Sequence, residues 1–238
     1  IGSRVGADHE TRGDRIVEAL QAAAGVQPRV DEQRDRVCLG LAAQRGHRGL
    51  RRIGLFGGSF DPVHNAHLAL ARAAWRDLEL DEVRWIPAGH PWQKARVLTD
   101  AGHRAAMVAL AVEAEPGFVL DPIELRRPGP SYTLDTVREL QAAQPDAQWF
   151  LIIGQDQQAA LPTWHGAEEL LGRVTLAVAR RPGSDDGGAP APAARTVFLP
   201  PMDLSSTQVR ARCAAGLPID EMVPAGVARY IDQHGLYR

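Results

Sequence analysis

From Arg52 onward, short apolar runs alternate with stretches whose apolar residues recur at helical spacing. The apolar runs predict strands over Arg52–Phe56, Val83–Ile86, Phe118–Leu120, Gln148–Ile153, Val174–Ala179 and Thr196–Leu199. The stretches between them predict helices over Ala66–Leu78, Asp100–Ala114, Thr133–Ala143, Ala167–Leu171, Ser206–Ala215 and Ala225–His234. Because most of the strands are apolar throughout, rather than at every second residue, they predict a parallel sheet that is buried on both faces.

Alternating strands and helices with right-handed crossovers predict a doubly wound α/β fold, formed as one domain by residues 51–238. In such sheets ligands bind beyond the carboxyl ends of the strands. The loops after Phe56, Ile86, Ile153 and Leu199 are therefore the expected places for chemistry.

The first 50 residues have a different pattern. One amphipathic helix is predicted near Asp14–Ala24, and polar sequence rich in Arg, Asp and Gln follows it. We expect residues 1–50 to be a loosely attached or poorly ordered extension, or the product of a misassigned start.

The composition narrows the class of protein. With 45% hydrophobic and 24% charged residues among 238, the chain has the profile of a soluble globular protein, and no apolar run approaches the ~20 residues of a membrane helix. A formal net charge of −2 disfavours a nucleic-acid-binding surface. Cys38 and Cys213 are too few for a disulfide framework, so we expect a reduced, cytoplasmic protein. All but one of the 27 cationic residues are arginines, and the exception is Lys94.

The loop after the first predicted strand reads Gly-Gly-Ser-Phe-Asp-Pro-Val-His-Asn-Ala-His, from Gly57 to His67. Two glycines let the backbone approach a ligand closely, and the N–H groups of the loop and of the next helix can bind an anion. His64 and His67 fall on neighbouring faces of the first helical turn. A pair of this kind can also be a cap and a packed histidine, but its place after a Gly-Gly turn favours a chemical role. The absence of a Walker A or G-x-G-x-x-G pattern disfavours a redox dinucleotide protein.

A second candidate anion site comes late in the chain. Leu204–Arg210 reads Leu-Ser-Ser-Thr-Gln-Val-Arg, which follows a short predicted strand and opens a helix. A hydroxyl at this position is most often only a helix cap. Here it also brings backbone N–H groups and Arg210 together, an arrangement that suits a triphosphate.

These two stretches resemble the signatures of the nucleotidylyltransferase superfamily. Gly54–His67 is similar to GGxFDPxHxGH, with Ala66 in place of a glycine, and Leu204–Arg210 is similar to ISxTxIR, with Leu204 and Val209 at the isoleucine positions. The resemblance implies a Rossmann-like fold and catalysis by positioning and electrostatics, without a covalent intermediate. It implies that His64, His67 and Arg210 are catalytic, and that ATP is bound by Gly57, Gly58, Ser59, Phe60, Ser205, Thr207 and Arg210.

Further stretches resemble the bacterial nicotinate-nucleotide adenylyltransferases: Pro130–Thr133, Ile152–Asp156 with Trp164, Arg180–Gly183 and the ending Ile231–Arg238. The resemblance covers about residues 52 to 238. An indole is a good platform for a pyridine ring, and N–H groups around Tyr132 and Thr133 could bind a carboxylate. The substrate-binding residues implied are Tyr132, Thr133, Asp156, Trp164 and Arg180.

The loop after the second predicted strand reads Pro-Ala-Gly-His-Pro-Trp-Gln-Lys, from Pro87 to Lys94. The family often has Pro-Pro-His followed by Lys or Arg at this place. Trp92 and Gln93 depart from that pattern, whereas Lys94 stays in register and is the implied catalytic phosphate contact. Asp100, His103 and Arg104, at the start of the next helix, are expected to be caps and surface residues.

The resemblance implies transfer of AMP from ATP to nicotinate mononucleotide, with nicotinate adenine dinucleotide and pyrophosphate as products, in NAD biosynthesis. Mg²⁺ is expected to be held by phosphate oxygens, and no residue is assigned as a metal ligand. The alternatives are another acceptor, such as nicotinamide mononucleotide or phosphopantetheine, and a non-catalytic nucleotide-binding module. The expected partners are small molecules, with no nucleic acid and no membrane, and the sequence predicts no oligomeric state.

Overall fold

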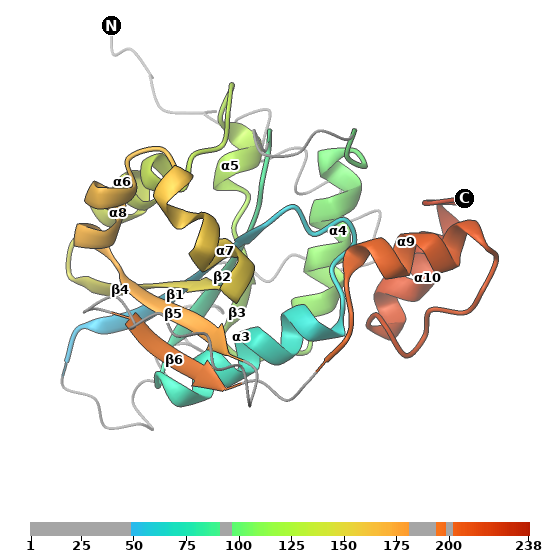
Figure 1. Ribbon diagram of the computed structural model, residues 1–238, viewed down its shortest axis with the longest axis horizontal. Helices are drawn as coiled ribbons and strands as arrows, with labels where there is room; N and C mark the ends of the chain where they lie inside the picture. The colour runs from blue at the N-terminus through green and yellow to red at the C-terminus, as the bar shows by residue number, and fades with distance from the viewer. Residues whose placement is uncertain (1–48, 91–96, 181–193, 199–201) are drawn as a thin grey trace, which may run out of the picture.

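In the computed structural model, six parallel strands form one sheet in the order β3-β2-β1-β4-β5-β6 (Figure 1). The structure describes residues 49–90, 97–180, 194–198 and 202–238. The strands are β1 (Arg51–Gly58), β2 (Glu82–Pro87), β3 (Phe118–Leu120), β4 (Ala147–Ile153), β5 (Thr175–Arg180) and β6 (Ala194–Phe198). This arrangement confirms the predicted doubly wound α/β fold.

Helices follow most of the strands. The predicted helices are present as α3 (Asn65–Asp77), α4 (Ala101–Val112), α6 (Thr133–Ala143), α8 (Ala167–Arg173), α9 (Ser206–Ala214) and α10 (Ala225–Gln233). Three short helices were not predicted, because they offer too few residues for a period to emerge: α5 (Ile123–Arg126), α7 (Gln155–Ala160) and the 3₁₀ helix η1 (Leu161–Thr163). The predicted helix Asp14–Ala24, residues 1–48 of the expected extension and Lys94 lie outside the described residues.

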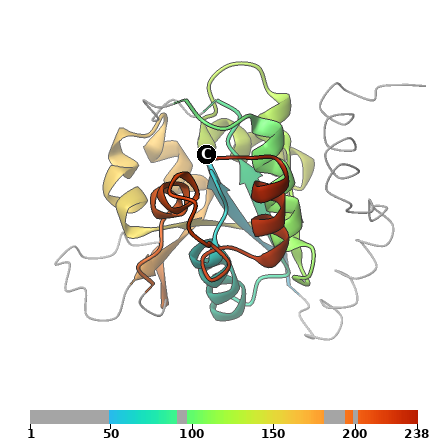
Figure 2. The ribbon, with the colours of Figure 1, turned by 90° about the vertical axis from the view of Figure 1, so that its right-hand side faces the viewer.

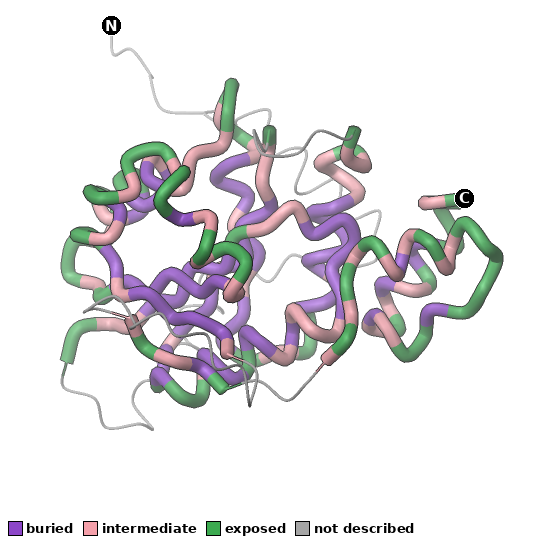
Figure 3. The backbone as a smooth tube through the Cα atoms, viewed as in Figure 1, coloured by how far each residue is buried: buried purple, intermediate pink, exposed green. Residues whose placement is uncertain are grey.

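The sheet is buried on both faces, as its apolar strands predict. Phe56 of β1 and Trp85 of β2 belong to a core that includes residues of α3, α4 and α10. Ile53 and Leu55, which point to the other face of β1, belong to a second core with residues of α6 and α8. Figure 3 shows buried backbone through the middle of the sheet and exposed backbone on the outer turns.

The order of the strands shows where in the sheet a ligand is expected to bind. The chain adds β2 and β3 on one side of β1, then returns to place β4, β5 and β6 on the other. β1 and β4 therefore form the switch point, where crossovers on opposite faces leave a crevice beyond the carboxyl ends of the strands. In Figure 1, α9 and α10 lie together to one side of the sheet, next to α4. Within the described residues, no helix is both long enough and apolar enough to cross a membrane.

Candidate active site

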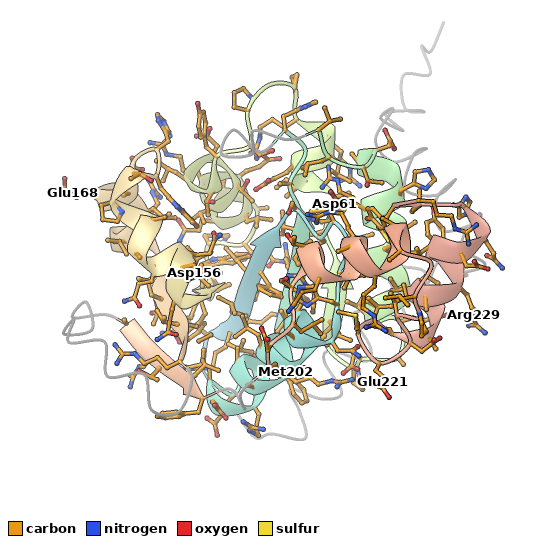
Figure 4. The ribbon with its side chains drawn as sticks, turned by 45° about the vertical axis from the view of Figure 1, so that its right-hand side comes forward. Asp61, Asp156, Glu168, Met202, Glu221 and Arg229 are labelled. Carbon is orange, nitrogen blue, oxygen red and sulfur yellow. The ribbon has the colours of Figure 1, made fainter. Side chains whose placement is uncertain are left out.

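A cleft of about 750 Å³ opens at this switch point. It is lined from one side by the loop between β1 and α3 and by α9, and from the other by α6, α7 and the ends of β4 and β5. In Figure 4, Asp61 of the first loop and Asp156 of α7 lie on opposite sides of β1. The lining includes most of the predicted site residues: Gly57, Gly58, Ser59, Phe60, His64, His67, Thr133, Asp156, Trp164, Arg180, Ser205, Thr207 and Arg210.

His64 and His67 form a stacked pair at the start of α3. Their ring centroids are 3.6 Å apart, and the ring planes make an angle of 25°. The backbone N–H of His64 donates a 3.1 Å hydrogen bond to Nδ1 of His67. Since Nδ1 accepts, a neutral His67 ring carries its proton on Nε2, which leaves that atom as a hydrogen-bond donor.

Both imidazoles are neutral near pH 7. Burial lowers the pKa of His64 to about 4. Burial, with a smaller contribution from the neighbouring His64, also lowers the pKa of His67 well below its ordinary value. The pair is therefore suited to donating a hydrogen bond to an anion, rather than to holding a positive charge before the anion arrives.

A cluster of buried aromatic side chains packs against His67 of the histidine pair. Phe60, at φ +46° and 2% exposed, packs edge-on against His67, with ring centroids 5.2 Å apart. The rings of Phe56 and Trp85 lie 5.5 and 5.4 Å from that of Phe60. Phe60 is predicted to be part of the ATP site. Its ring belongs to the hydrophobic core and packs against the imidazole of His67.

Two hydrogen bonds join the two signature stretches, which are far apart in the sequence. The hydroxyl of Ser206 donates to the carbonyl of Pro62 at 2.9 Å. Nη1 of Arg210 donates to the carbonyl of Asp61 at 2.7 Å. The amino ends of α3 and α9, which both attract anions, therefore face one cleft from adjoining loops.

The start of α9 has a capping box. The backbone N–H of Gln208 donates to Oγ of Ser205 at 3.3 Å, and the backbone N–H of Ser205 donates to Oε1 of Gln208 at 2.7 Å. Nη2 of Arg210 donates to the hydroxyl of Thr207 at 3.1 Å. Ser205 and Thr207 remain exposed to solvent, so their polar groups are open to a ligand.

The other side of the cleft differs in one respect from the sequence prediction. Thr133, Trp164 and Arg180 line the cleft together with the exposed Asp156. Tyr132 is not among the lining residues, and its ring packs against that of His165 with centroids 4.5 Å apart. Its backbone still leads directly into the first turn of α6.

A buried carboxylate beneath this side of the cleft had no signal in the sequence. Glu124 of α5 lines the cleft and accepts a 2.9 Å hydrogen bond from the hydroxyl of Thr136. Burial raises the pKa of Glu124. Ser131 binds the adjoining loop, since its Oγ accepts hydrogen bonds from the backbone N–H groups of Gly89 and His90 at 3.1 and 3.2 Å. These contacts fix the loop that precedes α6.

Arg104 corrects a sequence prediction. Arg104 was expected at the surface, but only 1% of the residue is exposed to solvent. Its guanidinium donates to the carbonyls of Thr99 and Ser59 at 2.9 and 2.8 Å, and to that of Gly89 at 3.5 Å. One side chain thus connects three loops, of which two line the cleft. Asp100 caps α4 as expected, by accepting from the backbone N–H of Gly102 at 2.8 Å.

Comparison with known proteins places the chain in a family. The model of the cytidylyltransferase-like family matches residues 55–212. A protein of Methylibium petroleiphilum, named "Probable nicotinate-nucleotide adenylyltransferase", is 54% identical over 200 residues, which cover 79% of this chain and 92% of that protein. A protein of the same name from Bordetella petrii is 49% identical over 199 residues, covering 79% of this chain and 100% of that protein.

The fold agrees with that of a solved structure. The nicotinic acid mononucleotide adenylyltransferase of Plasmodium falciparum, complexed with NaAD, superposes with a TM-score of 0.67 at 18% identity, covering 79% of this chain and 97% of that one. At this identity the likeness concerns the fold alone, and the family follows from the closer relatives. With both signatures facing one cleft and relatives of this identity, the chain belongs to the nicotinate-nucleotide adenylyltransferase family.

Proposed function

We propose that this protein transfers AMP from ATP to nicotinate mononucleotide, forming nicotinate adenine dinucleotide and releasing pyrophosphate. The observation that carries the proposal is the junction of the two signature loops, where Ser206 binds the carbonyl of Pro62 and Arg210 that of Asp61. This junction brings two helix amino ends, an arginine and two histidines to one cleft.

The triphosphate of ATP is assigned to the side of the cleft formed by the first loop and α9. Gly57, Gly58 and Ser59 offer backbone N–H groups, and Ser205 and Thr207 offer exposed hydroxyls. Arg210 supplies a permanent positive charge beside Thr207. Phe60 contributes through its backbone, since its ring is buried.

The reaction requires no protein nucleophile. An oxygen of the mononucleotide phosphate attacks the α-phosphorus of ATP, a new P–O bond forms, and the bond to the β-phosphate oxygen breaks as pyrophosphate leaves with the electron pair. Negative charge on the α-phosphate oxygens is stabilised by the Nε2–H of His67 and by Arg210. His64 orients His67 through its backbone N–H and by stacking.

The acceptor is assigned to the side of the cleft lined by Trp164, Thr133, Asp156 and Arg180. The indole of Trp164 offers a flat apolar surface for the pyridine ring. The amino end of α6, at Thr133, suits the nicotinate carboxylate. Asp156 is an exposed acceptor for ribose hydroxyls.

We propose that Mg²⁺ enters the site with ATP, held by phosphate oxygens whose charge it neutralises. Asp61, the carboxylate of the first loop, is 0% exposed and its Oδ1 accepts from Tyr237, so we assign it no role as a ligand. No group of three or more His, Cys, Asp or Glu suited to a metal occurs in the described part of the chain. The compartment that we propose is the cytoplasm, as the cysteine content predicts.

The test is an acceptor comparison with the purified full chain, ATP and Mg²⁺. Nicotinate mononucleotide, nicotinamide mononucleotide and phosphopantetheine are supplied separately, while pyrophosphate release and the dinucleotide product are measured. We expect turnover with all components present and the highest kcat/KM with the nicotinate form. Preference for the amide or for phosphopantetheine would refute the proposed acceptor, and ATP binding without turnover would indicate a nucleotide-binding module.

A further inference from the structure

Glu124 of α5 is a buried acid on the acceptor side of the cleft. Only 8% of the residue is exposed, and it lines the cleft together with Thr133 and Trp164. No step of the transfer reaction requires an acid at this place. An ionisable side chain that is withdrawn from water must be hydrogen-bonded, so the groups that bind Glu124 indicate what it does.

Two side chains bind Glu124 from the two sides of one helix start. The hydroxyl of Thr136 donates to Oε1 at 2.9 Å, and the side chain of Ser131 forms a second hydrogen bond with the carboxyl group. Burial raises the pKa of Glu124, and these two hydrogen bonds oppose that rise. Helix α6 begins at Thr133, so Ser131 comes two residues before the helix and Thr136 lies at the end of its first turn. Glu124 therefore holds the amino end of α6 on both sides.

Ser131 extends these contacts to the loop after β2. Its Oγ accepts hydrogen bonds from the backbone N–H groups of Gly89 and His90 at 3.1 and 3.2 Å, and its own N–H donates to the carbonyl of His90 at 3.1 Å. The chain between α5 and α6 thus lies beside the end of β2 (Figure 2). A Cβ atom on Gly89 would lie 2.4 Å from the carbonyl oxygen of Glu124, so this loop packs directly on the backbone of α5. Three segments of the chain meet at Glu124.

The hydrogen bonds of the two hydroxyls explain why an acid is suited to this place. The oxygen of Ser131 accepts from two backbone N–H groups, and that of Thr136 accepts from Nη1 of Arg127 at 3.0 Å. Each hydroxyl has a single proton to donate, and for Thr136 the carbonyl of Tyr132 is a more distant acceptor, at 3.4 Å. A carboxylate accepts at both of its oxygens, whereas the amide of a glutamine accepts at one atom and donates at the other.

We propose that Glu124 is a positioning residue for the acceptor: by accepting hydrogen bonds from Ser131 and Thr136, it holds the amino end of α6 against the loop after β2, in the place that receives a pyridine carboxylate. This inference rests on the proposed function, which assigns nicotinate mononucleotide to this side of the cleft. The amino end of a helix favours an anion only within its first turn, so the placement of that turn decides how well the carboxylate is bound.

The test uses steady-state kinetics of the full chain, with each substrate varied while the other is saturating. Glu124→Gln keeps the size of the side chain and replaces one acceptor atom by a donor, and we expect the KM for nicotinate mononucleotide to rise about 10-fold. The KM for ATP and kcat should stay within about threefold of the wild-type values, because a loss of ground-state binding appears in the KM of the substrate concerned.

Glu139→Gln is the matched control. This exposed glutamate of α6 forms an ion pair with Arg127, which also binds Thr136, so the control makes the same chemical change in the same network but in solvent. It should leave kcat and both KM values within about twofold of the wild type.

A comparison of acceptors separates positioning from a merely structural role. Nicotinamide mononucleotide has no carboxylate for the helix end to hold, so Glu124→Gln should lower the preference for the nicotinate form over the amide about 10-fold. Where the amide form is not turned over, its Ki as a competitive inhibitor takes the place of its KM. A merely structural role would reduce kcat/KM equally for both acceptors and would raise the KM for ATP as well. Either of these results, or a wild-type KM for nicotinate mononucleotide in Glu124→Gln, would overturn the proposal.

If Glu124→Gln does not fold, as judged by circular dichroism, two variants of its partner replace it. Thr136→Val removes the hydroxyl and must raise the KM for nicotinate mononucleotide, whereas Thr136→Ser keeps the hydroxyl and should not. Equal KM values for these two variants would also overturn the proposal. A wild-type enzyme that prefers another acceptor would refute the proposed function, whereas a nicotinate enzyme whose variants behave like the wild type would refute this inference alone.

Discussion

The backbone N–H of His64 donates to Nδ1 of His67, so one histidine of the signature fixes the tautomer and the orientation of the other. Stacking of the rings at 3.6 Å holds them together, and the aromatic rings of Phe56 and Phe60 lie against His67 on a further side. The proton on Nε2 of His67 is therefore set by the fold before any ligand enters.

His67→Ala removes the proposed donor to the α-phosphate. We expect kcat to fall roughly 100- to 1,000-fold, as for the loss of one preorganised donor in other enzymes. His234→Ala, at an exposed histidine after α10, should retain kcat within about twofold. Steady-state kinetics measure kcat for both variants, and circular dichroism shows whether each variant is folded. A folded His67→Ala enzyme with nearly full activity would contradict the assigned role.

Acid should destabilise the folded state through the histidine pair. The pKa of His64 is about 4 in the folded state and about 6.5 when unfolded, so between these values the unfolded chain binds more protons. Stability is therefore full above about pH 6.5 and falls as the pH falls toward 4, with a loss of about 2 kcal/mol at pH 5 from His64 alone. His67 acts in the same direction.

The measurement is the free energy of unfolding in urea at several pH values, for the wild type and His64→Asn. The raised pKa values of Asp121 and Glu124 act with the opposite sign, and the comparison with the variant cancels them. The variant should lose less stability than the wild type between pH 7 and pH 5. If the free energy of unfolding falls equally with pH in the wild type and in His64→Asn, burial of His64 does not control its protonation.

Gly89→Ala should disturb the acceptor side of the cleft. A Cβ atom at this position would lie 2.4 Å from the carbonyl oxygen of Glu124, a backbone atom that cannot move aside alone. We expect a loss of about 1 to 3 kcal/mol in stability and a raised KM for nicotinate mononucleotide. Gly172→Ala, in α8, should be neutral or stabilising, because no atom apart from its chain neighbours and the backbone of its own helix lies within 4 Å of the new Cβ. Equal unfolding midpoints for the two variants would refute this account.

Arg104→Met should weaken the fold near the cleft. The substitution removes the buried guanidinium that donates to the carbonyls of Ser59 and Thr99, at a cost of about 3 kcal/mol or more. Arg212→Met is the control, because its guanidinium also donates to a carbonyl, that of Pro218, but near the surface. The control should lose less than about 1 kcal/mol. Urea unfolding of both variants provides the comparison.

Lys94 lies outside the described residues, and its role is predicted from the sequence alone. We expect Lys94→Ala to raise the KM for ATP about 10-fold, because a charge-assisted phosphate contact is lost. Lys94→Arg should have a smaller effect. Arg76→Ala, at an exposed side chain of α3, serves as the surface control. If the two alanine variants have equal KM values, the lone lysine reflects only the arginine bias of the composition.

Most of the fold could be predicted because its signals are local. The apolar run at the first strand predicts Arg52–Phe56, and β1 spans Arg51–Gly58. The short helices α5 and α7, with four and six residues, contain less than two turns and so no readable period. Local pattern thus predicts the strands and the long helices, and fails where a helix has fewer than two turns.

The site was predictable only where chemistry is concentrated in consecutive residues. His64 and Arg210 stand in motifs, and both line the cleft. Arg104 is followed in the sequence by Ala105, Ala106 and Met107, and nothing in that run indicates that its charge is buried and hydrogen-bonded to three loops. Tyr237 contacts Asp61 across 176 positions, a distance that no local pattern records.

The buried guanidinium of Arg104 has a consequence for variation among related sequences. It binds three main-chain oxygens, of residues 59, 89 and 99, and main-chain oxygens are present whatever the side chain. The position of the loop backbone at these residues therefore does not depend on which side chains they carry. Ser59 lines the cleft, so substitutions there can change the surface of the cleft while the arginine keeps the backbone in place. This makes Ser59 the natural choice for a library that seeks altered substrate preference.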